Sequence, residues 1–404
     1  MAARRHVARS LALSALLAVI GSACVGPDLA GRPPPQRTVE VTLVDVFSGS
    51  TGATGRSLRN GLELEASAIN ARGGLLGSRV EIVAADGEMN PAKAAELVRQ
   101  QVGDASTGLV VGPDSTASFL AAREALDHAG MPNCVVQMAD RALGGARSTF
   151  RVGPPNSAEV GVLLDAVRRT RPDVHGIALL DEGDELGRSY DEQLAAQAGG
   201  IGLAYVGRVA AGADADRAAL QQLTAQGAQV VVVALRPAGA ARVAQTALQL
   251  GGSRPLLAGF GVLAEYGFPS SGGDAAVGAV LATTPQTYLT GLPQAQWPRG
   301  YRAFVGAAGR LYGFGGEDSQ LQATPAGADC LRQWARAVTT AGTFAGAAVT
   351  SAWERLDLPA DQTALGVHER LTSGQHSAVA KDGLFAYTWA REGSRYRLKP
   401  VPTD

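Results

Sequence analysis

The sequence predicts an α/β protein built from two doubly wound, Rossmann-like lobes. Three observations lead to this prediction. Short runs rich in β-branched residues alternate with segments of helical periodicity, the alternation restarts after the Gly- and Pro-rich stretch 151–155, and the run 230–235 is apolar throughout. An uninterrupted apolar strand is typical of a parallel sheet covered on both faces. Two βα series in tandem favour two lobes, and 404 residues suit more than one core.

The first series precedes the stretch 151–155. Its opening strand, 39–46, leads into the Gly-rich segment 48–55, which we expect to be a loop. Apolar residues then recur at helical spacing over 58–69, and Gly73-Gly74 end that helix. Asn90 supplies the N-cap of the next helix, which begins at a proline. The other expected elements are strands at 79–85, 109–111 and 133–138 and a helix at 118–129 closed by Gly130.

The second series follows the same pattern. Strands are expected at 177–180, 204–209, 230–235 and 256–258, with helices at 220–225 and 240–250. Ligands of doubly wound folds bind beyond the carboxyl ends of the parallel strands. The working surface should therefore consist of loops 48–55, 113–118 and 137–140 of the first lobe, facing loops 181–187, 236–239 and 260–263 of the second.

The N-terminal segment 1–24 predicts export. Three arginines precede an apolar stretch at 11–20 that is too short to span a bilayer, and small residues at 21–23 lead directly to Cys24. A cysteine in this place resembles a bacterial lipobox, so we expect lipidation at Cys24, with plain secretion as the alternative. Residues 25–38 are Pro-rich and predict an extended tether. The protein is thus expected outside the cytoplasm, anchored to the membrane by its lipid.

Composition excludes several other classes. The chain has 36 Lys+Arg against 37 Asp+Glu, so it lacks the basic excess of a nucleic-acid-binding protein. Its 3 Cys are too few for a disulfide scaffold. Apart from Cys24, the two cysteines Cys134 and Cys330 can pair in an oxidising compartment or remain buried and free, and the sequence leaves both possibilities open.

No motif for catalysis or for a cofactor is present. The glycines of segment 48–55 match neither the dinucleotide nor the P-loop spacing, no two histidines stand at a zinc-binding spacing, and no nucleophile elbow occurs. The acidic run Asp181–Glu185 is the one carboxylate-rich loop on the expected working surface. We interpret it mainly as a solvated loop, with ligand contact and acid/base catalysis as alternatives. We expect no enzyme activity, no cofactor and no metal.

Several segments together resemble the leucine/isoleucine/valine-binding protein family, the type 1 periplasmic binding proteins of ABC transporters. They include Phe47-Ser48-Gly49, the helix end Ala68–Gly77 and Asn90-Pro91, and the similarity extends over nearly all of residues 39–400. The resemblance implies two lobes joined by a hinge of three strands. The expected bounds of the lobes are 39–152 and 284–380 for lobe 1, and 153–283 and 381–404 for lobe 2.

The resemblance also implies a ligand pocket between the lobes. Thr54 stands where the family often has a tyrosine, and Thr116 or Ser115 supplies the hydroxyl that meets a ligand carboxylate. Gly261 replaces the acid that pairs with an α-ammonium, and a buried ammonium without a carboxylate costs several kcal/mol. A standard branched-chain amino acid is therefore a poor fit. Arg236 suits a carboxylate. The expected ligand-contacting residues are Ser50, Thr54, Ser115, Thr116, Gln137, Met138, Ala139, Glu185, Leu186, Arg236, Phe260 and Gly261.

Structural roles remain open for three of these residues: Arg236 as a solvated helix start, Thr116 as an N-cap, and Met138 as part of the core. The resemblance implies an extracytoplasmic solute-binding lipoprotein of an ABC importer. It would capture an amino-acid-like molecule or a small carboxylate or amide and pass it to permease subunits. The alternatives are a sensory or regulatory module of the same fold and, more weakly, an enzyme that uses the carboxylates of Asp181–Glu185.

Overall fold

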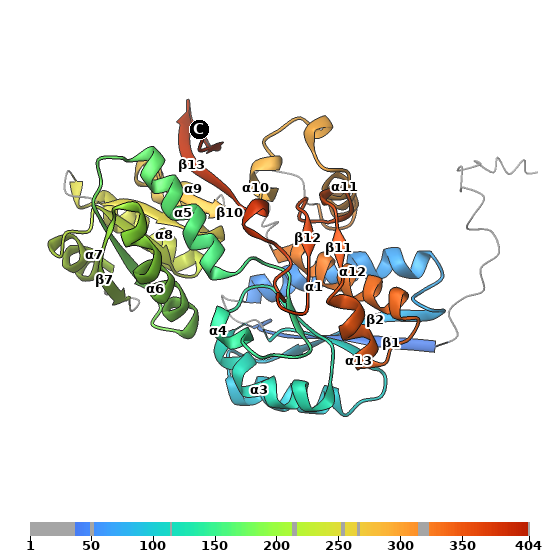
Figure 1. Ribbon diagram of the computed structural model, residues 1–404. Coiled ribbons are helices and arrows are strands. Elements are labelled where there is room, and N and C mark those ends of the chain that lie inside the picture. The colour runs from blue at the N-terminus through green and yellow to red at the C-terminus, as the bar shows by residue number, and fades with distance from the viewer. Residues whose placement is uncertain are drawn as a thin grey trace, which may run out of the picture. The chain divides into compact units, whose positions relative to one another are not determined.

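The computed structural model describes residues 37–48, 52–113, 115–211, 216–251, 255–264, 267–313 and 323–402. All of them belong to the compact unit Pro34–Asp404. They form two α/β lobes, each with its own largely parallel sheet and helices on both faces of that sheet (Figure 1). The predicted fold class of two doubly wound lobes is therefore confirmed.

The sheet of the first lobe is entirely parallel, with strand order β2-β1-β3-β4-β5. On β1, Val41 and Leu43 face one core and Val44 faces the other, as the period of two requires. Helices α1 and α12 cover the first face, and α2 and α3 cover the second (Figure 1). The bounds are β1 Arg37–Asp45, α1 Gly52–Ala71, β2 Ser78–Asp86, α2 Pro91–Val102, β3 Thr107–Val111, α3 Thr116–Ala129, β4 Asn133–Val135, α4 Asp140–Leu143 and β5 Thr149–Arg151.

The second sheet has the order β14-β13-β10-β9-β8-β6-β7, and its two C-terminal strands are antiparallel. Helices α5 and α6 cover one face, and α7, α8 and α9 cover the other. The bounds are α5 Asn156–Thr170, β6 Gly176–Asp181, α6 Glu185–Gln197, β7 Ala204–Ala210, α7 Asp216–Ala225, β8 Val230–Ala234, α8 Pro237–Leu248, β9 Leu256–Gly259, α9 Gly267–Gly272, β10 Val280–Thr283, β13 Phe385–Glu392 and β14 Arg395–Pro400.

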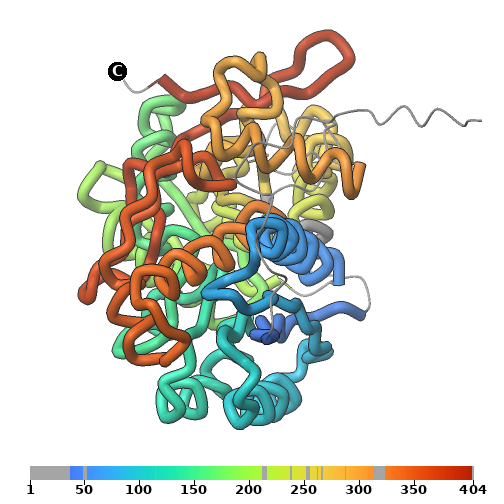
Figure 2. Tube along the Cα trace, turned by 90° about the vertical axis from the view of Figure 1, so that its right-hand side faces the viewer, coloured from blue at the N-terminus to red at the C-terminus, as the bar shows by residue number. Residues whose placement is uncertain are grey.

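The chain passes between the lobes three times: from β5 to α5, from β10 back to the first lobe, and from β12 to β13. The returning segment packs on α1, and Figure 2 shows α12 lying beside it. Glycines allow this contact, because a Cβ on Gly61 would lie 1.9 Å from the Thr324 carbonyl oxygen. The bounds of the returning segment are α10 Gln286–Leu289, α11 Arg299–Tyr312, α12 Ala323–Ala341, α13 Gly346–Trp353, β11 Asp357–Leu358 and β12 Glu369–Arg370.

Two local predictions are wrong. Helix α1 begins at Gly52, inside the segment 48–55 that we expected to be a loop. Gly52 and Gly55 pack so closely on the carbonyls of Phe47 and Val46 that a Cβ at either position would lie 2.3 Å from the oxygen, so these glycines serve a tight helix start. The strand expected at 133–138 ends at Val135, after which the chain turns inward and buries Met138. By contrast, the cap of α2 by Asn90 and the left-handed Gly130 after α3 are confirmed.

Cys134 and Cys330 form a disulfide, which resolves the alternative that the sequence left open. Cys134 lies in β4 and Cys330 in α12, 196 residues apart in sequence, and both are fully buried. The bond therefore joins the returning segment to the sheet of the first lobe. Closing so long a loop restricts the unfolded chain and stabilises the folded one.

Removing this bond should destabilise the protein. We expect the double variant Cys134→Ala/Cys330→Ala to lose about 2–5 kcal/mol of unfolding free energy, measured by urea denaturation. Wild-type protein reduced in denaturant should lose a similar amount, whereas a reductant should not affect the double variant. A double variant as stable as the oxidised wild type would contradict this expectation.

Candidate functional site

The candidate site lies where the carboxyl ends of the parallel strands of the two sheets meet, the usual ligand position in this class of fold. Two groups of side-chain contacts join the lobes there. One group extends from the end of β4 in the first lobe to α5 and α6 in the second, and the other joins the end of β2 to the end of β8. The ends of β1 and β3 lie between these contacts in the strand order.

The first group centres on Tyr190 of α6. Gln137 of the first lobe donates from Nε2 to the Tyr190 hydroxyl over 2.8 Å. That hydroxyl in turn donates to Oε2 of Glu159 over 2.7 Å. The Tyr190 ring stacks on Phe260, which follows β9, with the ring centroids 4.1 Å apart. A chain of hydrogen bonds from Gln137 through Tyr190 to Glu159, the polar relay, thus leads from one lobe into the interior of the other. The stacked rings of Tyr190 and Phe260 lie beside it.

The turn into α4 adds a second connection. Asp140 accepts hydrogen bonds from the backbone N–H groups of Asn156 (2.9 Å) and Ser157 (3.1 Å), at the start of α5. A carboxylate at a helix N-terminus is stabilised by the unpaired N–H groups and the helix dipole. The same carboxylate pairs with Arg151 over 2.7 Å. The first crossing between the lobes is therefore held by a residue of the first lobe.

Arg236 and Glu185, two expected ligand contacts, already have charged partners. Arg236 pairs with Glu182 over 3.2 Å, and its Nη1 lies 3.2 Å from Met89 Sδ of the first lobe. Glu185 is paired with Arg141 of the first lobe and with a neighbouring arginine on α6. An anionic ligand at Arg236 would therefore have to compete with Glu182.

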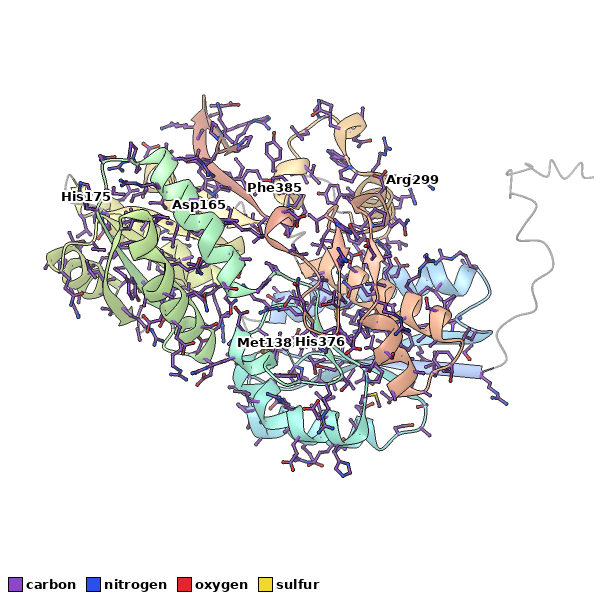
Figure 3. All side chains as sticks on the ribbon, in the orientation of Figure 1. Met138, Asp165, His175, Arg299, His376 and Phe385 are labelled. Atoms are coloured by element: carbon purple, nitrogen blue, oxygen red, sulfur yellow. A yellow bond between two sulfur atoms is a disulfide. The ribbon has the colours of Figure 1, made fainter. Side chains whose placement is uncertain are left out.

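The remaining expected contacts occupy different environments. Ser115, not Thr116, is the N-cap of α3, and the Thr116 hydroxyl accepts a hydrogen bond from the backbone N–H of Ala139 over 3.2 Å. Met138 and Ala139 are fully buried in the core beneath α3. Figure 3 shows Met138 on the segment that leads into α4. Leu186 and Gly261 are half-buried, Phe260 is buried, and Thr54 is exposed in the first turn of α1. Ser50 and Cys24 lie outside the described residues.

Sequence reasoning missed four buried residues at the junction of the lobes: Arg151, Asn156, Glu159 and Tyr190. The half-buried Asp140 lies in the expected loop 137–140 but was not singled out. Each occupies an ordinary position at the start of a helix, on a helix or at the end of a strand, and no local pattern marks it. These residues can be recognised only from the tertiary structure, because each contacts a partner from another helix or strand.

The run Asp181–Glu185 is only in part the solvated loop that we expected, because Glu182 and Asp184 are exposed whereas Asp181 is buried. Asp181 is fully buried and pairs with Arg208, and Asp184 is the N-cap of α6, accepting from Gly187 N over 2.8 Å. These two carboxylates therefore have structural partners in the second lobe. Across the described ranges, no group of three or more potential metal ligands comes together. None of the helices described there combines the length and apolar character needed to cross a bilayer.

Two further groups at the carboxyl edges lack hydrogen-bond partners. Oδ2 of Asp45, the last residue of β1, accepts no hydrogen bond, and neither does Oε1 of Gln286, just beyond β10. Both residues are buried. Burial raises the pKa of Asp45 to about 6, and the charge of nearby Asp86 acts in the same direction. An unpaired buried acceptor costs about 1–3 kcal/mol and calls for an explanation.

Glu159 makes stability depend on pH. Burial raises the pKa of this carboxyl to about 7, against an ordinary value of 4.5, although Tyr190 and Asn156 donate to it. Between pH 4.5 and about 7, the folded protein therefore holds a proton that the unfolded chain has already released. The contribution of Glu159 to stability is complete below pH 4.5 and is lost as the pH rises to about 7.

The Glu159→Gln variant should not show this loss, because its amide oxygen still accepts from Tyr190 and carries no charge. Since a rise in pKa from 4.5 to about 7 corresponds to about 3 kcal/mol, the variant should be more stable than the wild type by about that amount at pH 8. The two should be similar at pH 4. Thermal unfolding of both proteins across this range measures the difference. A difference that does not change with pH would count against the buried, ionisable Glu159.

The comparisons with known proteins agree with this architecture. A family model described as "periplasmic binding protein" matches residues 38–391. Among curated protein sequences, none matches the chain. A solved periplasmic binding protein type 1 from Bordetella pertussis Tohama I is 17% identical, with a TM-score of 0.77, covering 90% of this chain and 100% of that one.

Two further solved structures are described with bound molecules. LivJ from Streptococcus pneumoniae, a branched-chain amino acid transporter substrate-binding protein in complex with isoleucine, is 16% identical with a TM-score of 0.72, covering 90% of this chain and 100% of its own. A solute-binding protein of an ABC transporter from Rhodopseudomonas palustris BisB5, in complex with 3,4-dihydroxybenzoic acid, is 16% identical with a TM-score of 0.73, covering 91% and 98%. At this level of identity, these likenesses concern the fold.

Proposed function

The chain belongs to the periplasmic binding protein family, and we propose that it is an extracytoplasmic solute-binding lipoprotein of an ABC importer. The observation that carries the proposal is that the ligand-binding edges of two parallel sheets meet and exchange side-chain contacts, such as Gln137 with Tyr190. A molecule held there would touch both lobes only when they are together. That differential contact shifts the population of conformations toward the closed one.

The ligand proposed is amino-acid-like or a small carboxylate or amide. The neighbours described with isoleucine and with 3,4-dihydroxybenzoic acid support this range of sizes and chemistries. The proposed contacts are those expected from the sequence, at the ends of β1, β3 and β4 in the first lobe and of β6, β8 and β9 in the second. The carboxylates of the run Asp181–Glu185 already hold structural partners, so the protein needs only to bind the molecule and release it unchanged.

We assign residues 39–152 and 284–380 to one lobe and residues 153–283 and 381–404 to the other. Residues 1–24 are proposed as a lipoprotein signal, with the lipid on Cys24, and residues 25–38 as the tether. The Cys134–Cys330 disulfide supports a location outside the cytoplasm, because structural disulfides persist mainly in oxidising compartments. The tethered lobes would deliver the ligand to permease subunits in the membrane.

Binding without chemistry can be tested directly. Purified protein should be stabilised by its ligand in a thermal-shift screen of amino acids, small carboxylates and amides, since ligand at 100 times its Kd adds about 2.7 kcal/mol. After denaturation, the compound should be recovered unchanged by mass spectrometry. Recovery of a converted product would contradict a binding role and favour an enzyme.

The membrane anchor makes a separate prediction. In a bacterial host, the wild-type protein should partition into the detergent phase and the Cys24→Ala variant into the aqueous phase, because a lipid chain supplies the membrane affinity. The matched control is Thr38→Ala at an exposed position, which leaves Cys24 and the disulfide in place and should partition like the wild type. A Cys24→Ala protein that stays with the membrane would refute lipidation at this residue.

A further inference from the structure

The burial of the Asp45 carboxylate requires a physical explanation. It is the last residue of β1, a strand with neighbours on both sides, and so stands at the carboxyl edge of the first sheet. The residue is only 7% exposed. Its Oδ1 accepts from the N–H of the next residue, Val46, over 2.6 Å, and its Oδ2 has no partner.

The neighbouring acid, Asp86, shows what a structural carboxylate looks like at the same edge. Asp86 is paired in register with Asp45 on the adjacent strand. Its Oδ1 accepts from the N–H groups of Phe47 (3.2 Å) and Glu88 (2.9 Å), which fixes the turns after β1 and β2. Asp86 thus has a complete structural role, whereas half of the Asp45 carboxylate has none.

No cation compensates the charge of Asp45 within the described part of the chain. The basic residues near this edge have other partners: Lys93 pairs with Glu88 over 2.6 Å, and Arg56 donates to the Phe47 carbonyl over 2.9 Å. The charge that acts on Asp45 is the like charge of Asp86. A buried charge without a partner costs several kcal/mol.

The surroundings of Asp45 connect it to the site between the lobes. In the strand order, β1 lies between β2, whose end carries the Met89–Arg236 contact, and β4, whose end carries the Gln137–Tyr190 hydrogen bond. A second buried acceptor without a donor follows β10, where the chain returns to the first lobe, because Gln286 is 3% exposed and its Oε1 accepts no hydrogen bond.

We propose that Asp45 is the counter-charge for a protonated nitrogen of the ligand, so that the protein binds small molecules carrying an ammonium group and not simple acids. This inference rests on the proposed binding function and narrows its ligand class. It places the carboxylate that pairs with the ligand's ammonium group in the first lobe. Gly261 in the second lobe has no side chain that could provide this carboxylate.

A rival role for Asp45 is purely structural. The first turn of α1 packs on it, since a Cβ on Gly55 would lie 3.3 Å from the Asp45 Cγ. The positive end of that helix favours a carboxylate nearby. If this were its whole role, replacing Asp45 would lower stability and leave ligand preference unchanged. The two roles therefore predict different outcomes.

The experiment compares molecules that differ only in charged groups. Purified wild-type protein is titrated with leucine, its deaminated acid 4-methylpentanoate and its decarboxylated amine 3-methylbutylamine. The corresponding set is phenylalanine, 3-phenylpropionate and 2-phenylethylamine, and 3,4-dihydroxybenzoate is added as an acid without nitrogen. Thermal shift and calorimetry give the affinities. We expect the protein to bind ammonium-bearing compounds of these sets. The matched acids should bind roughly 100-fold more weakly.

Two variants separate ligand contact from folding. Asp45→Asn keeps the shape and the acceptor for Val46 N, so it should fold at least as stably as the wild type and lose roughly 100-fold in affinity for the best amine. Asp86→Asn, the matched control, should bind that amine as the wild type does.

The outcomes are distinct. If the acids bind as tightly as their ammonium-bearing partners, or if Asp45→Asn retains full affinity for the amine, the inference is overturned and the binding function stands. If no compound of any set binds, both the inference and the proposed ligand range are overturned.

Discussion

The ion pair between Arg151 and Asp140 is the interaction on which the arrangement of the lobes depends. Arg151 is only 2% exposed. Its guanidinium donates to the Met138 carbonyl over 2.5 Å and to the Ser377 hydroxyl over 2.7 Å, and it pairs with Asp140. It therefore holds together the end of β4, the segment before the third crossing and, through Asp140, the start of α5. Breaking such a buried pair typically costs about 3–5 kcal/mol because a charge is left uncompensated.

The polar relay between the lobes extends from this anchor. With the turn into α4 fixed, Gln137 reaches Tyr190, which in turn satisfies Glu159 and stacks on Phe260. Both Glu159 and Asp45 are acids kept away from water near the junction of the lobes, but they differ in their partners. Glu159 has donors from its own lobe, whereas Asp45 lacks a donor for one oxygen. The first is explained by the fold itself, and the second is the group that points to a ligand.

Local chemistry made much of the fold predictable. Uninterrupted apolar runs marked the parallel strands, and Asn90 and Gly130 marked helix ends through side-chain capping and left-handed backbone. The failures arose where a distant partner decides the outcome. The glycines at 52 and 55 look like loop residues until the carbonyls of Phe47 and Val46, just after β1, pack on them. Asp181 looks solvated until Arg208 of the next strand is placed beside it, and the pairing of Cys134 depends on a helix 196 residues away. The site was predictable as an edge of two sheets, but not its buried polar contacts.

The central claim is that a small molecule brings two lobes together, and solution X-ray scattering tests it most directly. The radius of gyration of the protein should fall when the tightest-binding compound is added at saturation and stay constant when a matched non-binding analogue is added. The same fall should occur at every protein concentration used, which excludes association. A compound that binds tightly and leaves the radius unchanged would contradict the account, because its site would then lie within one lobe.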